Sequence, residues 1–343
     1  MLELNRSAIW PCRLLVKRDS DMNASSVDLH KEGLSLRVQS ITYLARDTYL
    51  VALTSPHGAA LPAAEPGAHI DLHLGNGLIR SYSLVNPAAQ PTEYVVGIKL
   101  DVASRGGSRY VHEQLRVGSQ IHVSEPRNLF PLKEGVSHTV LIAGGIGITP
   151  IWCMAQHLEA SGASWELWYS ARTRADAAFL TQFEMLKDKV HLHFDDEIGQ
   201  VLDLKSIVSH AASDAHLYCC GPTPMLDAYE LAAAQRDPET VHLERFAAKE
   251  AAALEGGFVV ALARSGKELT VPEGSSILQV LLDNDVAVDF SCQEGICGCC
   301  EVAVLEGTVD HRDAVLSDKE RAEGKTMMVC CSGAKCARLV LDI

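Results

Sequence analysis

The chain has 343 residues, which at ~100–200 residues per domain predicts two or three domains. Its hydrophobic content of 47% and charged content of 22% are those of globular proteins and exclude a disordered or collagen-like chain. With 30 Lys and Arg against 44 Asp and Glu, the net charge of −14 has the wrong sign for a nucleic-acid-binding protein.

Residues 1–33 form a polar stretch that we predict to be a loose leader, with Met22 as an alternative start. The stretch lacks the basic region followed by an apolar run that marks a secretory signal. The chain also lacks the ~18–20 consecutive apolar residues of a membrane helix, so no membrane partner is expected. Eleven cysteines without a signal sequence are typical of metal or redox chemistry in a reducing compartment, which predicts a cytoplasmic protein.

Residues 34–135 contain short apolar runs separated by turn residues. Residues 69–74 alternate apolar and polar side chains, as in a strand with one buried face. The glycines of 75–77 predict a tight turn, and 78–85 the returning strand. Further strands are predicted at 94–100 and 120–123. This pattern indicates an antiparallel β-barrel or sandwich.

Residues 136–246 alternate buried strands with helices, which predicts an α/β domain with a parallel sheet. The apolar run 139–143 is typical of a strand that is buried on both faces. Strands are predicted at 139–143, 165–169, 190–194 and 216–220, and helices at 151–159, 175–186 and 224–234. Residues 195–197, three consecutive acids, are expected to form a solvated loop.

Residues 247–256 are rich in Ala and Glu and are either a linker or a short helix. Beyond them the pattern indicates a third, smaller domain at 257–343. It consists of a hairpin at 257–263 and 268–271, a helix at 276–284, a cysteine loop at 289–300 and a final strand at 338–343.

The cysteine loop carries the most specific motif. Cys292, Cys297 and Cys300 have the C-x4-C-x2-C spacing of a plant-type [2Fe–2S] site, which takes a fourth, distant cysteine. That fourth ligand is Cys330 or its neighbour Cys331, while Cys299 and Cys336 are not expected to bind iron. The alternative is a zinc site made of Cys297, Cys300, Cys331 and Cys336.

Two loops that join a strand to a helix are candidates for binding a dinucleotide. Residues 144–150 contain three glycines, which allow the backbone to approach a pyrophosphate near a helix start. Thr149 suits the N-cap of that helix and Pro150 its first turn. The second loop, 219–225, also follows a strand, so both belong to the same sheet edge. Either loop alone is weak evidence.

A candidate flavin motif lies on the strand after the predicted hairpin turn, at residues 80–84. Arg80 and Tyr82 share one side of this strand, with Ser81 and Ser83 on the other. An arginine can grip a phosphate, and a tyrosine can cover an aromatic ring system. Residues 105–108 predict a loop able to present N–H groups to the same phosphate.

Along the chain the flavin motif comes first, the dinucleotide loops second and the cysteine loop last. In this order the three motifs resemble the phthalate dioxygenase reductase family, which includes vanillate demethylase reductases. The resemblance extends over 35–343 and includes the 310–313, 315–317 and 327–330 segments, which point to Cys330 as the fourth ligand. It implies a multi-domain fold with an antiparallel β-barrel flavin domain and an α/β parallel-sheet nucleotide domain. An α+β β-grasp ferredoxin domain completes it. The expected bounds are 34–135, 136–246 and 257–343, with a linker at 247–256.

The resemblance also implies the site residues. The catalytic residues are Ser83, Cys220 and Phe246, and the metal ligands are Cys292, Cys297, Cys300 and Cys330. The cofactor-binding residues are Arg80, Ser81, Tyr82, Ser83, Leu84, Ile98, Lys99, Gly106, Gly107, Ser108, Gly144, Gly145, Gly147, Thr149, Pro150, Arg172, Cys220, Gly221, Pro222, Met225 and Phe246.

The implied function is that of an NADH-dependent reductase that passes electrons through FMN and a [2Fe–2S] cluster to a Rieske-type oxygenase or demethylase. FAD in place of FMN is an alternative. NADPH in place of NADH is a second one, because Arg172 lies where an arginine can bind a 2′-phosphate. Another acceptor, such as a cytochrome or a di-iron hydroxylase, and a zinc-bearing binding module without turnover are the other hypotheses. We expect the acidic residues near the cluster to steer the partner. These are Glu294, Glu301, Glu306, Asp310 and Asp313.

Overall fold

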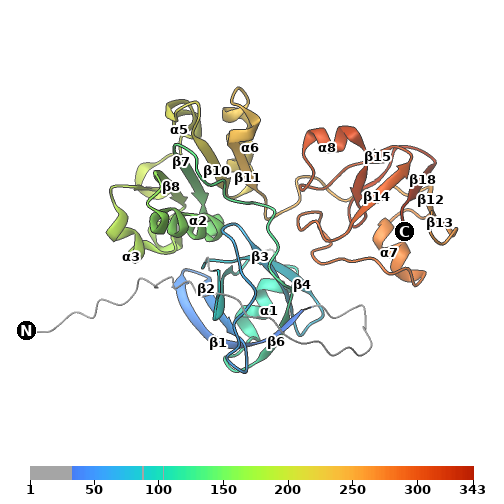
Figure 1. Cartoon of the computed structure of the whole chain (residues 1–343), viewed down its shortest axis with the longest axis horizontal. Coiled ribbons are helices and arrows are strands. Elements are labelled where there is room, and N and C mark those ends of the chain that lie inside the picture. Colours follow the sequence, from blue (N-terminus) through green and yellow to red (C-terminus); the bar gives the residue numbers. More distant parts are fainter. Residues whose placement is uncertain (1–32, 87–88, 103) are drawn as a thin grey trace, which may run out of the picture. The chain divides into compact units, whose positions relative to one another are not determined.

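The computed structural model describes residues 33–86, 89–102 and 104–343, and 33–343 form one compact unit. The predicted leader therefore lies outside the described residues, apart from Gly33. Figure 1 shows three sheets that follow one another along the chain. In the part of the chain that the structure describes, no helix has the length and apolar character needed to cross a membrane.

The first sheet confirms the predicted antiparallel barrel. Its six strands have the order β4-β3-β6-β1-β2-β5, and a bridge between Leu84 and Val96 joins its two ends. The strands are β1 Leu34–Ala45, β2 Thr48–Thr54, β3 His69–His73, β4 Ile79–Ser83, β5 Glu93–Lys99 and β6 Gln120–Val123. A helix that the sequence pattern did not predict, α1 Gly107–Glu113, follows β5.

Strand β3 is buried on both faces, although its alternating sequence predicts one polar, solvated face. Ile70 and Leu72 lie in the barrel core, as expected. Asp71, on the opposite face, is only 2% exposed because Arg127 and Ser81 contact its carboxylate. The face of β3 that the pattern predicts to be solvated is therefore covered, and its aspartate belongs to a buried polar network with Arg127 and Ser81.

The second sheet is parallel, as predicted, with the order β11-β10-β7-β8-β9. Its strands are β7 Thr139–Gly144, β8 Trp165–Ala171, β9 Val190–Phe194, β10 His216–Cys220 and β11 Val241–Glu244. The α-helices around them are α2 Ile148–Ser161, α3 Leu180–Phe183, α4 Asp195–Ile198, α5 Leu204–His210 and α6 Thr223–Ala233. Short 3-10 turns lie at η1 Gly145–Gly147, η2 Arg174–Asp176, η3 Glu184–Leu186 and η4 Pro238–Thr240.

Two local predictions in this domain are wrong. The single helix expected at 175–186 is broken, because Phe179 adopts a left-handed conformation with φ 61° and buries its ring beside Trp152. The solvated loop expected at 195–197 is instead the short helix α4, which ends at Gly199 in a left-handed C-cap with φ 78°. The strand β11 and the helix α5 were not predicted.

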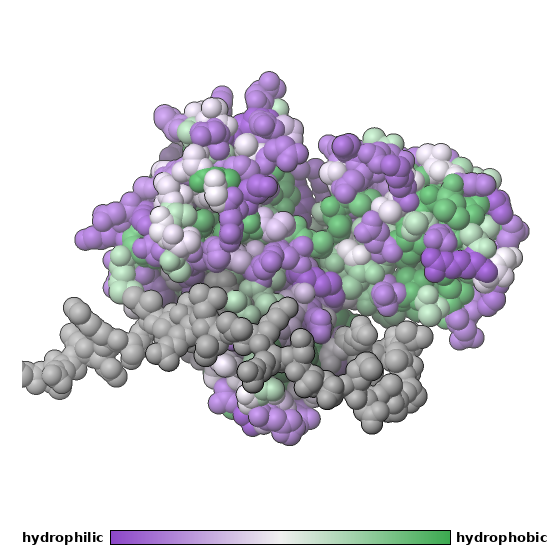
Figure 2. Space-filling view, in the orientation of Figure 1, coloured by the Kyte–Doolittle hydropathy of each residue, from purple (hydrophilic) through white to green (hydrophobic). Residues whose placement is uncertain are grey.

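The third sheet is mixed and has the order β13-β12-β18-β14-β16, beside a small pair of β15 and β17. Its elements are β12 Phe258–Leu262, β13 Glu268–Val271, α7 Ile277–Asp283, β14 Glu301–Glu306, β15 Val309–Asp310, α8 Asp318–Glu323, β16 Thr326–Met328, β17 Gly333–Ala334 and β18 Arg338–Leu341. Residues 247–256 contain no helix, unlike the short helix that was one of the two alternatives. Hydrophilic side chains interrupted by apolar patches cover the visible face of this C-terminal part (Figure 2).

Candidate functional site

The cysteine loop runs between α7 and β14. Cys292, Cys297, Cys300 and Cys330 are all buried, with 3–5% of their surface exposed. The loop turns through three left-handed positions, Gln293, Gly295 and Gly298. A side chain at Gly295 would lie 2.4 Å from the Cys331 sulfur, so this glycine is required for close packing as well as for its positive φ.

The four thiols lie close together. Side-chain contacts join Cys292 to Cys297 and Cys300 to Cys330, while Cys297 also contacts Cys299 and Cys330 also contacts Cys331. A [2Fe–2S] cluster has two irons, each of which takes two protein thiolates, so this pairing fits the cluster. The backbone N–H of Glu294 also donates to the Cys292 sulfur at 3.3 Å, the kind of contact that tunes a cluster's potential.

The zinc alternative does not fit these residues. The Cys336 sulfur contacts the N–H of Thr308 at 3.2 Å and the carbonyl oxygen of Arg338 at 3.1 Å. The Cys331 thiol contacts the Met328 carbonyl at 3.8 Å. The cysteine loop is therefore built for a cluster and not for one zinc ion.

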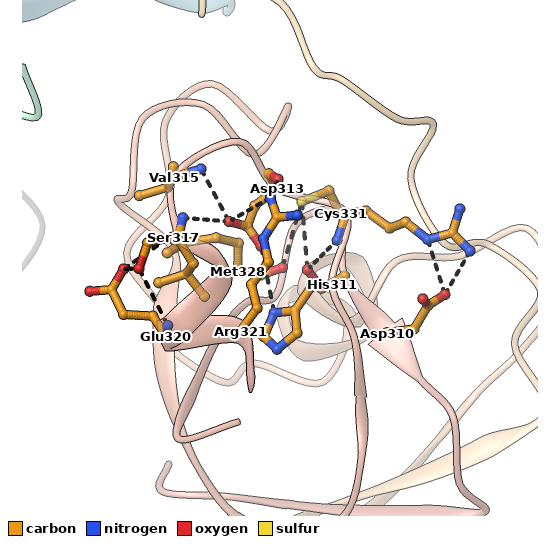
Figure 3. Close-up of polar contacts among 12 residues, drawn as sticks. Asp310, His311, Asp313, Val315, Ser317, Glu320, Arg321, Met328 and Cys331 are labelled. Atoms are coloured by element: carbon orange, nitrogen blue, oxygen red, sulfur yellow. Dashed lines mark hydrogen bonds and ion pairs between the residues drawn. The ribbon is translucent and has the colours of Figure 1, made fainter. Parts of the chain in front are cut away.

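A buried aspartate holds the segment beside the loop in place (Figure 3). The Asp313 carboxylate accepts hydrogen bonds from the N–H groups of Val315 at 3.1 Å and Leu316 at 2.8 Å. Arg321 donates to the Asp313 carbonyl, and the N–H of Ala314 donates to Gly295 at 2.8 Å. The segments 310–313 and 315–317, which are part of the family resemblance, thus form hydrogen bonds that hold the cluster loop in place.

On the barrel, the flavin motif occupies β4. The Arg80 side chain lies over the glycine turn, because a Cβ on Gly107 would be 2.7 Å from its Cγ. The Tyr82 ring is half-buried, and burial raises the pKa of its phenol to about 12, so it stays protonated. Leu84 and Ile98 are buried in the barrel core, so only their backbone atoms are available to a ligand.

The predicted phosphate loop is partly helical, which corrects the expectation for 105–108. Gly107 and Ser108 begin α1, while Gly106 before them has a φ of 101°. The sequence reasoning missed Ser104, whose hydroxyl oxygen accepts from the N–H of Gly106 at 3.2 Å and of Arg109 at 3.3 Å. Ser104 therefore satisfies one N–H group of the predicted loop, that of Gly106, and one of the following helical turn, that of Arg109.

A cavity of about 820 Å³ connects the two dinucleotide loops with the end of β5 and the chain after β11. Predicted residues that line it are Lys99, Gly144, Gly145, Gly147, Arg172, Gly221, Pro222, Met225 and Phe246. Thr149 and Pro150 are buried in α2 instead. The predicted N-cap is wrong, because α2 begins at Ile148 with Gly147 as its N-cap, and Thr149 donates to the Ile146 carbonyl at 3.0 Å.

The glycines of the two loops also pack against each other. A Cβ on Gly147 would lie 2.2 Å from the Cys220 carbonyl oxygen, and one on Gly144 would lie 2.5 Å from the Met225 sulfur. Gly221 is similarly enclosed by Met225 and Gly144. Close loop packing thus requires glycine at these positions independently of any nucleotide.

The structure adds Glu244 to the predicted catalytic group. Its carboxylate accepts from the Ser83 hydroxyl at 3.5 Å, and parallel pairing of β10 with β11 places it opposite Cys220. Burial raises the pKa of Glu244 to about 8, and the contact with Ser83 opposes that rise only in part. Burial also keeps Cys220 a thiol by raising its pKa. Phe246, two residues beyond Glu244, is 37% exposed beside this group.

The cluster loop and the barrel are in direct contact. Glu294, inside the loop, forms an ion pair with Arg105, just before the glycine turn. This changes the expected acidic surface, because the Glu294 side chain is only 14% exposed and Asp313 is buried. Of the five acids expected there, Glu301 and Glu306 are exposed.

Comparisons with known proteins agree with this architecture. A family model described as a 2Fe-2S iron-sulfur cluster binding domain matches residues 260–335. The chain is 53% identical to phenoxybenzoate dioxygenase subunit beta of Ectopseudomonas oleovorans, over 90% of this chain and 97% of that protein. It is 47% identical to tetrachlorobenzoquinone reductase of Sphingobium chlorophenolicum, over 90% and 98%. The solved phthalate dioxygenase reductase structure matches with 39% identity and a TM-score of 0.71, over 91% and 98%.

The barrel, the nucleotide sheet and the cysteine loop together define an NAD(P)H-dependent iron–sulfur flavoprotein oxidoreductase. The chain belongs to the phthalate dioxygenase reductase family. Membership confirms the predicted cofactor set of flavin, [2Fe–2S] cluster and pyridine nucleotide.

Proposed function

We propose that this chain is the reductase component that passes electrons from NADH, through FMN and a [2Fe–2S] cluster, to a Rieske-type aromatic-ring oxygenase or O-demethylase. The observation that carries this proposal is the Arg105–Glu294 ion pair, which joins the flavin-phosphate turn to the cluster loop. An electron can pass between two groups only where the protein brings them close together. The names of the relatives, a dioxygenase subunit among them, support an oxygenase as the acceptor.

We assign the domains as predicted, with a barrel at 34–135, a nucleotide domain at 136–246 and a ferredoxin domain at 257–343. Cys292 with Cys297, and Cys300 with Cys330, would each hold one iron. When bound, the nicotinamide supplies a hydride, the flavin divides the electron pair, and the cluster carries single electrons. The chain's own residues supply positions, charge and protection from water.

On the flavin side, Arg80 and the turn at Gly106 and Gly107 would hold the FMN phosphate, since the arginine already lies against the turn. Displacement of the Ser104 hydroxyl would expose two N–H groups to the phosphate oxygens. Tyr82 would cover a face of the ring system. Arg80 and Tyr82 lie on β4 and the glycine turn precedes α1, so phosphate binding would fix the flavin relative to β4.

On the nicotinamide side, the cavity between the two glycine-containing loops would receive the dinucleotide, with its pyrophosphate at Gly144–Gly147. Phe246 would cover the flavin until the nicotinamide displaces it. The Ser83 hydroxyl and the protonated Glu244 carboxyl would supply hydrogen bonds and a proton beside the reacting rings. Cys220 contributes an uncharged thiol to the same group.

The test is acceptor choice by the intact reductase. Anaerobic protein reduced with NADH would be mixed in turn with an oxidised Rieske oxygenase component, a di-iron hydroxylase component and tetrachlorobenzoquinone. We expect the Rieske component to be reduced fastest, and its EPR signal measures that reduction. The di-iron component and the quinone should be reduced slowly. Fastest reduction of the quinone would instead assign the activity named for the Sphingobium chlorophenolicum relative.

A further inference from the structure

A short segment after β6 connects the barrel to the cluster loop. Arg127 in this segment pairs with His69 of β3 through two backbone hydrogen bonds of 2.8 and 3.0 Å. Its guanidinium donates to the Asp71 carboxylate at 2.6 Å, and the Ser81 hydroxyl donates to the other oxygen of Asp71, also at 2.6 Å. Because the Asp71 side chain is only 3% exposed, this anchor holds Arg127 in one position.

The same segment meets the cluster ligands. Leu129 lies 3.5 Å from the position of a Cβ on Gly298, inside the cysteine loop. The Arg127 guanidinium interacts electrostatically with the thiols of Cys297 and Cys299, and the His69 ring interacts with Cys297. Arg127 belongs to the barrel, whereas Cys297 and Cys299 belong to the cysteine loop of the C-terminal domain. The positive charge of Arg127 therefore acts on a cluster site in a different domain.

The aspartate does not occupy the whole guanidinium. Among the described residues the Asp71 carboxylate accepts from Nη2 of Arg127, which leaves the other N–H groups of the guanidinium beside the cluster loop. The buried Nε of Arg127 and the buried Nε2 of His69 also lack hydrogen-bond partners among the described residues. An N–H group left over in a buried site beside thiolates is a candidate donor to the cluster sulfurs.

We propose that Arg127 raises the reduction potential of the [2Fe–2S] cluster for as long as the cysteine loop is seated against the barrel. The inference rests on the ligand set of the proposed function. Reduction moves one electron from the reduced flavin to the cluster, which gains one negative charge without forming or breaking a bond to the protein. A fixed cation nearby stabilises that added charge, and net charge and hydrogen bonds are known determinants of cluster potentials.

This arrangement has a consequence for the direction of electron flow. The flavin domain would draw the electron onto the cluster while the two domains are in contact. If the cysteine loop leaves the barrel to meet an acceptor, the cluster loses the influence of Arg127 and becomes the stronger reductant. The free energy by which Arg127 stabilises the reduced cluster must be returned when the reduced loop leaves the barrel, so Arg127 favours arrival of the electron and holds the reduced loop more tightly than the oxidised one.

The test is a redox titration of the intact protein, in which the EPR signal measures the fraction of reduced cluster. Arg127→Gln is expected to lower the ratio of reduced to oxidised cluster about three- to tenfold at a fixed potential, equivalent to ~30–60 mV for one electron. Arg127→Lys should keep most of the wild-type value. The matched control is Arg37→Gln, an exposed arginine of β1 whose guanidinium contacts Gln39. A midpoint for Arg127→Gln equal to that of the control would overturn the proposal.

A second variant separates charge from structure. Asp71→Asn removes the counter-ion and is expected to raise the midpoint, opposite to Arg127→Gln. If the ion pair served only to keep the barrel folded, both variants would break it and shift the midpoint in the same direction, which would also overturn the proposal. Failure of the ligand assignment is distinguishable, because wild-type protein would then show no [2Fe–2S] signal to titrate.

Discussion

The cluster loop and the flavin–nicotinamide site are built in opposite ways. Three of the four proposed iron ligands lie in one loop at 292–300, and one more follows β16. The flavin–nicotinamide site instead collects Arg80, Ser83, Cys220 and Glu244 from strands of two different sheets. A local loop forms its ligand set from chain geometry alone, whereas a distributed site needs two correctly folded domains.

This difference determines how each site should fail. Every thiolate of a cluster is a covalent ligand, so loss of one is expected to be nearly all-or-none. The distributed site shares its binding energy among many weaker contacts, so single substitutions should cause graded losses. The following experiments test this difference between all-or-none loss at the cluster and graded loss at the flavin–nicotinamide site.

The largest effect is expected for Cys330→Ser, which removes the proposed distant ligand. We expect the EPR signal of the reduced cluster to be lost or strongly altered, while reduction of the flavin by NADH continues. The matched control is Cys331→Ser, whose thiol contacts the Met328 carbonyl. A normal cluster in Cys330→Ser and a lost one in Cys331→Ser would move the assignment by one residue.

A graded effect is expected at the phosphate turn. Arg80→Ala should weaken FMN retention by about 1.5–3 kcal/mol, because a charge-assisted contact to the phosphate is lost. That loss corresponds to roughly a 10- to 150-fold higher dissociation constant, measurable by flavin fluorescence. Arg37→Ala, at an exposed arginine of β1 outside the phosphate turn, is the control. Equal losses in both variants, or mass-spectrometric detection of FAD in the wild type, would contradict the proposed flavin site.

A pH effect is expected from Glu244. Its pKa of about 8 lies above the ordinary value of 4.5, so the folded protein holds a proton that the unfolded chain releases. This contribution to stability is fully present below pH 4.5 and is lost as the pH rises to about 8. Glu244→Gln, which cannot ionise, should remove about 3–4 kcal/mol of that pH dependence between pH 5 and 8.

The measurement is the free energy of unfolding in urea at several pH values. Glu301→Gln serves as the control, because Glu301 is exposed and should leave the wild-type slope unchanged. A Glu244→Gln profile that is parallel to that of the wild type would mean that the carboxyl is ionised in the folded protein.

The smallest effect is expected for nucleotide choice. NADH should be preferred over NADPH in kcat/KM. Arg172 is exposed and lines the cavity, whereas Arg174 is paired with Glu197 at 3.0 Å. Arg172→Ala should therefore lower kcat/KM for NADPH about fivefold, close to 1 kcal/mol, and leave NADH unchanged. Arg174→Ala is the matched control, and an equal loss for both nucleotides would show that Arg172 does not contact a 2′-phosphate.

Local patterns predicted much of the fold because burial and turn chemistry act over short distances. The apolar run at 139–143 predicted the buried strand β7, and the helix predicted at 276–284 is found as α7 Ile277–Asp283. The predictions failed where tertiary contacts prevailed over the pattern. Phe179 broke a helix by turning inward to the core, and Asp71 was buried by an arginine 56 residues away.

The sequence by itself determined the chemistry of the cluster, because the spacing of cysteines in a tight loop sets which sulfurs can meet around two irons. It also determined the dinucleotide loops, whose glycines stand between a buried strand and a helix. Only the tertiary structure decided that Glu244 meets Ser83, 161 residues away, and that Arg127 of the barrel lies beside Cys297. Contacts of this kind depend on how separate sheets pack, and packing leaves no periodic pattern in the chain.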